Sequence, residues 1–143
     1  MSDVQIIVVD EATHAKTHMR TGTRMVAVQV PTDRAVTVQA QVNAKLIQRV
    51  QLWDGGGRMP FEWQGRGKGR TIGTGSFTFG SGPALVGCMS YRGDRWIVND
   101  LNVCADHDDG DRRIVIKCED GGGVPPDWDD LVVTLRWPNG EAA

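Results

Sequence analysis

Apolar and polar residues alternate along most of this chain with the period of two that is typical of a β-strand buried on one face. In residues 36–42, valine and alanine alternate with threonine and glutamine, and in residues 131–137 leucine, valine and tryptophan alternate with threonine and arginine. Similar short runs follow one another along the chain, most of them separated by turn-forming residues. The pattern predicts strands over residues 4–9, 25–30, 36–42, 46–53, 71–79, 84–91, 95–98, 114–118 and 131–137.

About nine short strands predict an all-β fold, an antiparallel β-sandwich of the jelly-roll kind, in one domain spanning residues 1–143. A helix is compatible only with residues 10–20, where Asp10 provides a cap. The glycine-rich stretch 54–70 is predicted to be a loop, and Arg92-Gly93-Asp94 to be the tight turn of a hairpin. Eighteen glycines are consistent with the many turns that this fold requires.

Composition narrows the class of protein. Hydrophobic residues make up 40% and charged residues 24%, which are ordinary values for a folded domain. The formal net charge of −2 provides no overall basic field for nucleic acid or an anionic membrane. No stretch is long and apolar enough to span a membrane, and no classical signal peptide is visible. We therefore expect a cytoplasmic protein, one exported without a classical signal, or a mature domain of a longer chain.

The three cysteines, Cys88, Cys104 and Cys118, cannot all pair within one chain, and none forms a Cys-x-x-Cys motif. Cys88 and Cys118 lie in apolar strand-like runs. We expect both to be buried free thiols.

Acidic residues are concentrated in the last third of the chain, where ten of the eighteen lie between Asp100 and Asp130. Residues 119–130, here called the acidic loop, join two predicted strands and combine carboxylates with three glycines and two prolines. Calcium takes about 6–8 oxygen ligands, from carboxylates, carbonyls and water. The loop therefore predicts a calcium site, and a solvated acidic turn is the alternative. Its five carboxylates, all candidate ligands, are Glu119, Asp120, Asp127, Asp129 and Asp130.

A second acidic cluster, residues 106–111, contains four aspartates but no glutamate placed to close an EF-hand loop. It precedes the strand that leads to Glu119, so it is predicted to lie at the opposite end of that strand. We interpret it as a separate solvated turn, with a second ion as the alternative.

Aromatic rings bind sugars by packing their faces against pyranose C–H groups. Trp128 lies inside the acidic loop and is the best candidate for such a platform, with core packing beneath the loop as the alternative. Trp53 and Trp63 flank the glycine-rich stretch and are candidates for a second wall of a site. Trp137 continues an apolar alternation and is predicted to be core.

The acidic loop also carries a resemblance. Glu-Asp-Gly, then Asp-aromatic-Asp-Asp, then Leu-Val-Val-Thr-Leu resembles bacterial calcium-dependent lectin-like β-sandwiches of the galactose-binding type, over residues 114–138. The resemblance implies a calcium that bridges protein and sugar hydroxyls, with Asp120, Asp127, Asp129 and Asp130 as its ligands and Asp120 and Asp127 also facing the sugar. Two features depart from the pattern: the Gly-Gly-Gly-Val-Pro-Pro run is longer, and Asp129 stands where asparagine is usual.

The prediction is thus a calcium-dependent carbohydrate-binding protein, and weak single sites would favour a homo-oligomer. No Gly-x-Ser-x-Gly motif or catalytic Ser/His/Asp pattern is present, so we do not expect an enzyme. A structural or adhesive module stabilised by calcium is the main alternative, and a membrane-active β-sandwich toxin is a weaker one.

Overall fold

A computed structural model describes residues 17–19, 26–80, 83–98, 100–107, 111–119 and 130–138. The predicted strand 4–9 and the interior of the acidic loop lie outside these residues. Within them the chain is all β, and every strand pairing is antiparallel. The strands are β1 (Thr17–Met19), β2 (Val26–Val28), β3 (Val36–Trp53), β4 (Phe61–Phe77), β5 (Ala84–Arg92), β6 (Arg95–Val98), β7 (Asp100–His107), β8 (Asp111–Glu119) and β9 (Leu131–Pro138).

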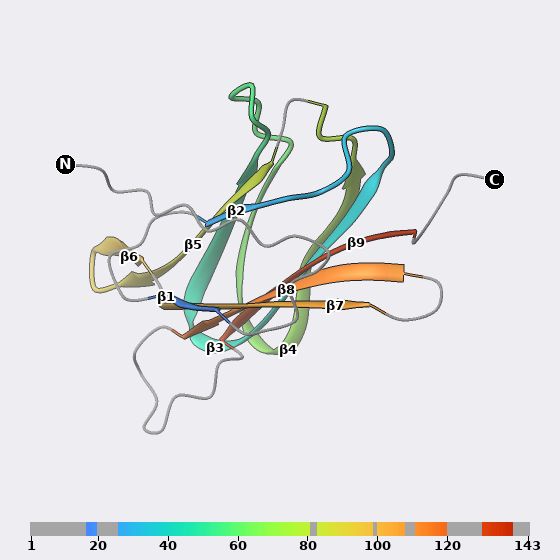
Figure 1. The fold of residues 1–143 in the computed structure, drawn as a ribbon. Coiled ribbons are helices and arrows are strands. Elements are labelled where there is room, and N and C mark those ends of the chain that lie inside the picture. Colours follow the sequence, from blue (N-terminus) through green and yellow to red (C-terminus); the bar gives the residue numbers. More distant parts are fainter. Residues whose placement is uncertain are drawn as a thin grey trace.

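The strands follow the order β1-β7-β8-β9-β3-β5-β2, with β4 added beside β3 and β6 beside β5. The long strand β3 belongs to both layers of the sandwich. Its residues 37–42 pair with β9, whereas its residues 48–53 pair with β5. Figure 1 shows β3 and β4 bent together into a V between these two parts. We call residues 43–47 of β3, with the part of β4 opposite them, the bend.

The bend has a local cause. The register between β3 and β4 shifts between Val42 and Ala44 and again between Ala44 and Gln48. Such bulges add residues to one strand and sharpen its curvature. The glycines Gly67 and Gly69 lie on β4 opposite this region at positive φ angles of 130° and 62°, which residues with a side chain rarely adopt.

The core lies between the two layers. Every even-numbered residue of β3 from 36 to 42 and from 48 to 52 is buried, as the alternation predicts. Valine, leucine and isoleucine side chains of β5, β8 and β9 complete the core, and Trp137 belongs to it as predicted. Cys88 on β5 and Cys118 on β8 are buried free thiols, which confirms that prediction.

The glycines of β4 have a packing role. Trp63 stacks with Phe61, with ring centroids 4.8 Å apart. A Cβ atom at Gly73 would collide with the Trp63 ring, and one at Gly75 would collide with the Phe61 ring. Glycine is therefore required in the second half of β4 because aromatic rings of the first half occupy the space where a side chain would project.

The fold class is the predicted one, but several elements differ from the prediction. The predicted strands 36–42 and 46–53 form one continuous strand, β3. Residues 61–70 were predicted to be loop and instead form the first part of β4. The strand β7 was not predicted at all. Residues 10–20, the only stretch compatible with a helix, are not helical at residues 17–19, which form β1 and pair with residues 101–103 of β7.

Other local predictions hold. Arg92 pairs with Arg95 across the turn between β5 and β6, and Gly93 takes a φ of 69° there, so the hairpin is confirmed. The described residues include no helix long and apolar enough to cross a membrane.

Candidate functional site

The acidic loop is a hairpin connection, as predicted. Strands β8 and β9 run antiparallel, and Cys118 pairs with Leu131 at the end of their ladder. Glu119 is the last residue of β8, and Asp130 directly precedes β9, so the two lie at the two ends of the loop. Asp120, Asp127, Trp128 and Asp129 lie outside the described residues.

Asp130 is buried where the loop enters the sandwich, with only 7% of its surface exposed. Its carbonyl oxygen accepts a hydrogen bond from the backbone N–H of Asn43, at 3.1 Å. Asn43 is half-buried and lies at the start of the bend, one residue beyond the last β3 residue that pairs with β9. The mouth of the acidic loop therefore adjoins the bend of β3.

Asn43 is a residue that the sequence reasoning missed. An asparagine follows directly after the apolar alternation of residues 36–42, which is a signal for the end of regular pairing. Its position beside Asp130 depends on the β3–β9 register, which crosses about ninety residues of sequence and is not visible in any local pattern.

Cys118 lies in the core just inside the loop mouth. Burial raises the pKa of its thiol well above the ordinary value; the hydrogen bond and charge of the Cys88 thiol and the negative charge of Asp130 raise it further. The Cys118 thiol is consequently protonated at neutral pH, and a protonated thiol is neither a nucleophile nor a metal ligand. The chemistry at this end of the sandwich therefore belongs to oxygen donors.

An oxygen-rich donor set with a buried carboxylate fits a hard divalent cation such as calcium. Asp130 supplies that carboxylate, and the acidic loop supplies four more. Among the described residues no three His, Cys, Asp or Glu side chains are grouped closely enough to hold a metal ion. A cation at this place would therefore depend on the interior of the acidic loop for most of its ligands.

The register of β7 with β8 brings a sixth acidic residue to the acidic loop, because Asp100 at the start of β7 pairs directly with Glu119. The second acidic cluster lies at the other end of the same strands: Asp106 pairs with Arg113, and Asp111 pairs with Pro138. The structure thus separates the two acidic regions by the length of β8, as the sequence analysis predicted.

Trp53 and Trp63 lie in the part of β3 and β4 that pairs with β5. Trp53 is the last residue of β3, ten residues from Asn43, which corresponds to roughly 30 Å along an extended strand. Trp63 pairs with Val50 in the same arm and packs against Phe61 and Gly73. Both residues are half-buried, and the Trp63 ring reaches Gly73, which pairs with Ala40 in the other arm of the V.

Comparison with known proteins supplies the family. Residues 28–139, which are most of the chain and include the whole acidic loop, match the fucose-binding lectin II (PA-IIL) family. The chain belongs to the fucose-binding lectin II family. Among curated proteins none matches the chain.

Three solved lectin structures share the fold. The Chromobacterium violaceum lectin CV2L in complex with α-methyl-fucoside has a TM-score of 0.63 and 24% identity, covering 78% of this chain and 95% of that one. A high-affinity mannose-binding lectin of Ralstonia solanacearum has a TM-score of 0.63 and 21% identity, with the same coverage. The C-terminal domain of the lectin BC2L-C of Burkholderia cenocepacia has a TM-score of 0.64 and 21% identity, covering 87% of this chain and 100% of that domain.

Family membership confirms the prediction of a carbohydrate-binding lectin. The family and the similar structures are lectins rather than enzymes, which agrees with the expectation of a non-enzymatic protein. Lectins of this family bind calcium, in agreement with the predicted cofactor. The narrower assignment to the galactose-binding type is not confirmed, because the matching family is described as fucose-binding.

Proposed function

We propose that the acidic loop binds calcium and that the ion coordinates sugar hydroxyls. The ligands would be Asp120, Asp127, Asp129 and Asp130, with Glu119 as a further ligand or as a support for one. The calcium would supply a charged centre that binds vicinal hydroxyls directly. Trp128 would provide an aromatic face for the sugar ring.

The observation that carries this proposal is the buried carboxylate at the loop mouth. Asp130 is 7% exposed at one end of a loop that contributes four other carboxylates. Carboxylates gathered this closely repel one another, and a divalent cation removes that repulsion. Trp53 and Trp63 lie in the part of β3 and β4 that pairs with β5, so Trp128 is the aromatic residue on which the proposal relies.

The sugar itself is part of the proposal. The relatives bind α-methyl-fucoside in one case and mannose in another, whereas the acidic-loop resemblance implied galactose. We propose that this chain binds a hexose of this group through two adjacent hydroxyls, and that it does so as a homo-oligomer. Several weak sites held in one assembly raise avidity without further contacts.

Calorimetric titration of the calcium-free protein tests the ion site. Wild type is expected to bind calcium, and the Asp127→Ala/Asp129→Ala double variant is expected to give no binding heat. The matched control is Asp106→Ala/Asp108→Ala, which removes two carboxylates from the second acidic cluster and should leave the titration unchanged. Unchanged affinity in the Asp127→Ala/Asp129→Ala variant would remove the proposed site.

A glycan array carrying fucose, mannose and galactose tests the sugar role. Binding is expected in calcium and absent in a chelator, and it should be lost in Trp128→Ala more than in Trp63→Ala. Binding that persists in chelator would contradict the calcium bridge. Calcium binding without any sugar binding would leave a structural ion in place of a lectin site.

A further inference from the structure

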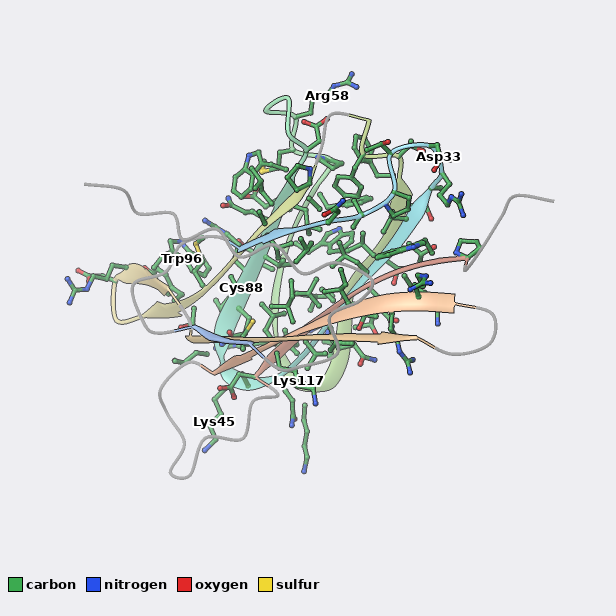
Figure 2. The ribbon with its side chains drawn as sticks, in the orientation of Figure 1. Asp33, Lys45, Arg58, Cys88, Trp96 and Lys117 are labelled. Atoms are coloured by element: carbon green, nitrogen blue, oxygen red, sulfur yellow. The ribbon has the colours of Figure 1, made fainter. Side chains whose placement is uncertain are left out.

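Four exposed cations lie together where β4 passes the bend. They are Lys45, Arg66, Lys68 and Arg70, here called the cationic bend. The register places them in one small region, because Ala44 pairs with Gly67 and Val42 pairs with Arg70. Figure 2 shows Lys45 projecting from the bend away from the sandwich. Because three of these cations fall within five consecutive residues, they form a strong local positive charge on a chain whose net charge is −2.

The backbone at this place favours their exposure. In the first part of β4 the exposed residues alternate with half-buried ones, but residues 68–71 are all exposed in succession. This break coincides with the bulges of the β3–β4 ladder and with the positive φ angles of Gly67 and Gly69. Arg66, Lys68 and Arg70 are two residues apart and are exposed by the alternation itself. The break adds exposure at Gly69 and Thr71, so the whole turn of β4 around these cations faces solvent.

Within the part of the chain that the structure describes, none of the four side chains of the cationic bend forms an ion pair or a side-chain hydrogen bond. Arg49, in the same ladder, shows the opposite situation. Its guanidinium donates to Gln64 Oε1 from Nε and Nη2, at 3.0 and 2.8 Å, and lies 3.9 Å from the centre of the Trp96 ring. Arg49 is thus engaged inside the protein, whereas the four cations of the cationic bend have no such contact with the described residues.

The cationic bend lies beside the proposed sugar site. Val42 pairs with Arg70 on one side and with Leu131, the first residue of β9, on the other. Two strand spacings therefore separate Arg70 from the end of the acidic loop, which is roughly 10 Å. At low ionic strength this separation is well inside the Debye length of about 30 Å, so the charge at the acidic loop and the charge of the cationic bend both act on one bound ligand.

We propose that the cationic bend extends the proposed sugar site and selects saccharides that carry an anionic group, a phosphate, sulfate or carboxylate, over their neutral counterparts. The inference rests on the proposed function, because the loop-bound ion would hold the hydroxyls while the cations meet the anionic group. Arginine suits this role because its planar guanidinium pairs with phosphate and sulfate oxygens through two parallel hydrogen bonds.

The test compares mannose with mannose 6-phosphate, and galactose with galactose 6-sulfate, by calorimetry in calcium at low salt. We expect the anionic sugar of each pair to bind about tenfold more tightly, since several exposed ion pairs together contribute on the order of 1.4 kcal/mol. The advantage should shrink in 0.5 M salt. In a variant with Gln at all four positions of the cationic bend, the ratio of the two affinities should fall to about one.

Two controls keep the result specific. Arg58→Gln/Arg95→Gln removes two exposed cations elsewhere and should preserve the ratio, and Arg66→Lys/Arg70→Lys keeps the charge and should retain much of it. Equal affinities in wild type, or a preference that persists in the four-glutamine variant, would overturn the inference; the cations would then serve to protect the edge of β4 from pairing with other chains. Binding of the anionic sugars that is unaffected by chelator would instead contradict the proposed function while leaving the cationic bend as an anion site.

Discussion

Two hairpin loops of this protein contain the same four-residue sequence, Asp-Gly-Gly-Gly, but differ in the number of carboxylates that they hold. The turn between β3 and β4 reads Asp54-Gly55-Gly56-Gly57, and the acidic loop between β8 and β9 contains Asp120-Gly121-Gly122-Gly123. Each loop also has one aspartate buried at its mouth, Asp54 at 3% exposure and Asp130 at 7%. The two loops differ in how these buried carboxylates are used.

Asp54 closes its own turn. Its Oδ1 accepts hydrogen bonds from the backbone N–H groups of Gly56 and Arg58, both at 2.9 Å, and its backbone N–H donates to the Arg58 carbonyl at 2.8 Å. Gly57 takes a φ of 89° to complete the turn. The carboxylate therefore has backbone donors in its own loop and needs no ion.

The acidic loop holds five carboxylates in twelve residues, and Asp130 makes its backbone hydrogen bond to a different strand, through Asn43. An aspartate followed by glycines therefore does not by itself indicate an ion site. What distinguishes the acidic loop is its number of carboxylates. A tight turn such as the one at Asp54 supplies backbone N–H donors for one carboxylate, whereas the acidic loop holds five.

The largest effect is expected from Asp54→Ala. This change leaves two N–H groups of a tight turn without their acceptor, and we expect the free energy of unfolding to fall by about 3 kcal/mol. Asp54→Asn keeps an acceptor oxygen and should cost less. Urea unfolding measures both, and calcium affinity should not change in either variant. A loss below about 1 kcal/mol in Asp54→Ala would contradict the structural role of this carboxylate.

Calcium should stabilise the folded protein, and it should do so only through the acidic loop. At a free concentration of one hundred times its dissociation constant, calcium should raise the free energy of unfolding by about 2.7 kcal/mol. The effect is expected in wild type and in Asp54→Asn, and it should be absent in Asp127→Ala/Asp129→Ala. Thermal unfolding with and without chelator measures it, and an equal shift in the loop variant would place the ion elsewhere.

The smallest effect concerns the thiol beside Asp130. The pKa of Cys118 is raised in the folded state, so the unfolded chain loses this proton first as the pH rises. Stability from this group is complete below about pH 8.5, the ordinary pKa of a thiol, and is lost above it at up to about 1.4 kcal/mol per pH unit. Asp130→Asn removes one cause of the raised pKa, so the loss should end at a lower pH.

Urea unfolding between pH 7 and pH 10 measures this loss, and Cys118→Ala serves as the reference. The alkaline slope should be smaller in Cys118→Ala than in wild type, because the variant lacks the titrating group. Equal slopes in the two proteins would show that other groups cause the alkaline loss of stability.

Sequence reasoning succeeded where a local pattern has one structural solution. The alternation in residues 36–42 and 131–137 predicted both the strands and the faces that they bury. The hairpin at Gly93 and the burial of Cys88 and Cys118 followed from equally local signals. The boundaries of the acidic loop also follow from local signals, because carboxylates and glycines interrupt the apolar alternation on both sides.

The same reasoning failed where pairing overrides local preference. Residues 61–70 are rich in glycine and cations, which disfavour strands, yet they extend along β3, which provides a ladder of backbone partners. Gly73 and Gly75 of β4 leave room for the Trp63 and Phe61 rings, which belong to the same strand on the other side of the bend. No local sequence pattern shows this contact. Trp53 and Trp63 were grouped with the acidic loop because they are aromatic; they lie in the part of β3 and β4 that pairs with β5, and their role in a sugar site stays a prediction.

The sequence alone determined the class of fold, the two ends of the acidic loop and the chemistry that its carboxylates favour, because these depend on residues close together along the chain. Only the tertiary structure decided that Asn43 adjoins Asp130 and that the cationic bend lies two strands from the acidic loop. Those relations come from the register of β3 with β4 and β9. Register is set by how two distant faces pack into one core, so it is not encoded at any single position.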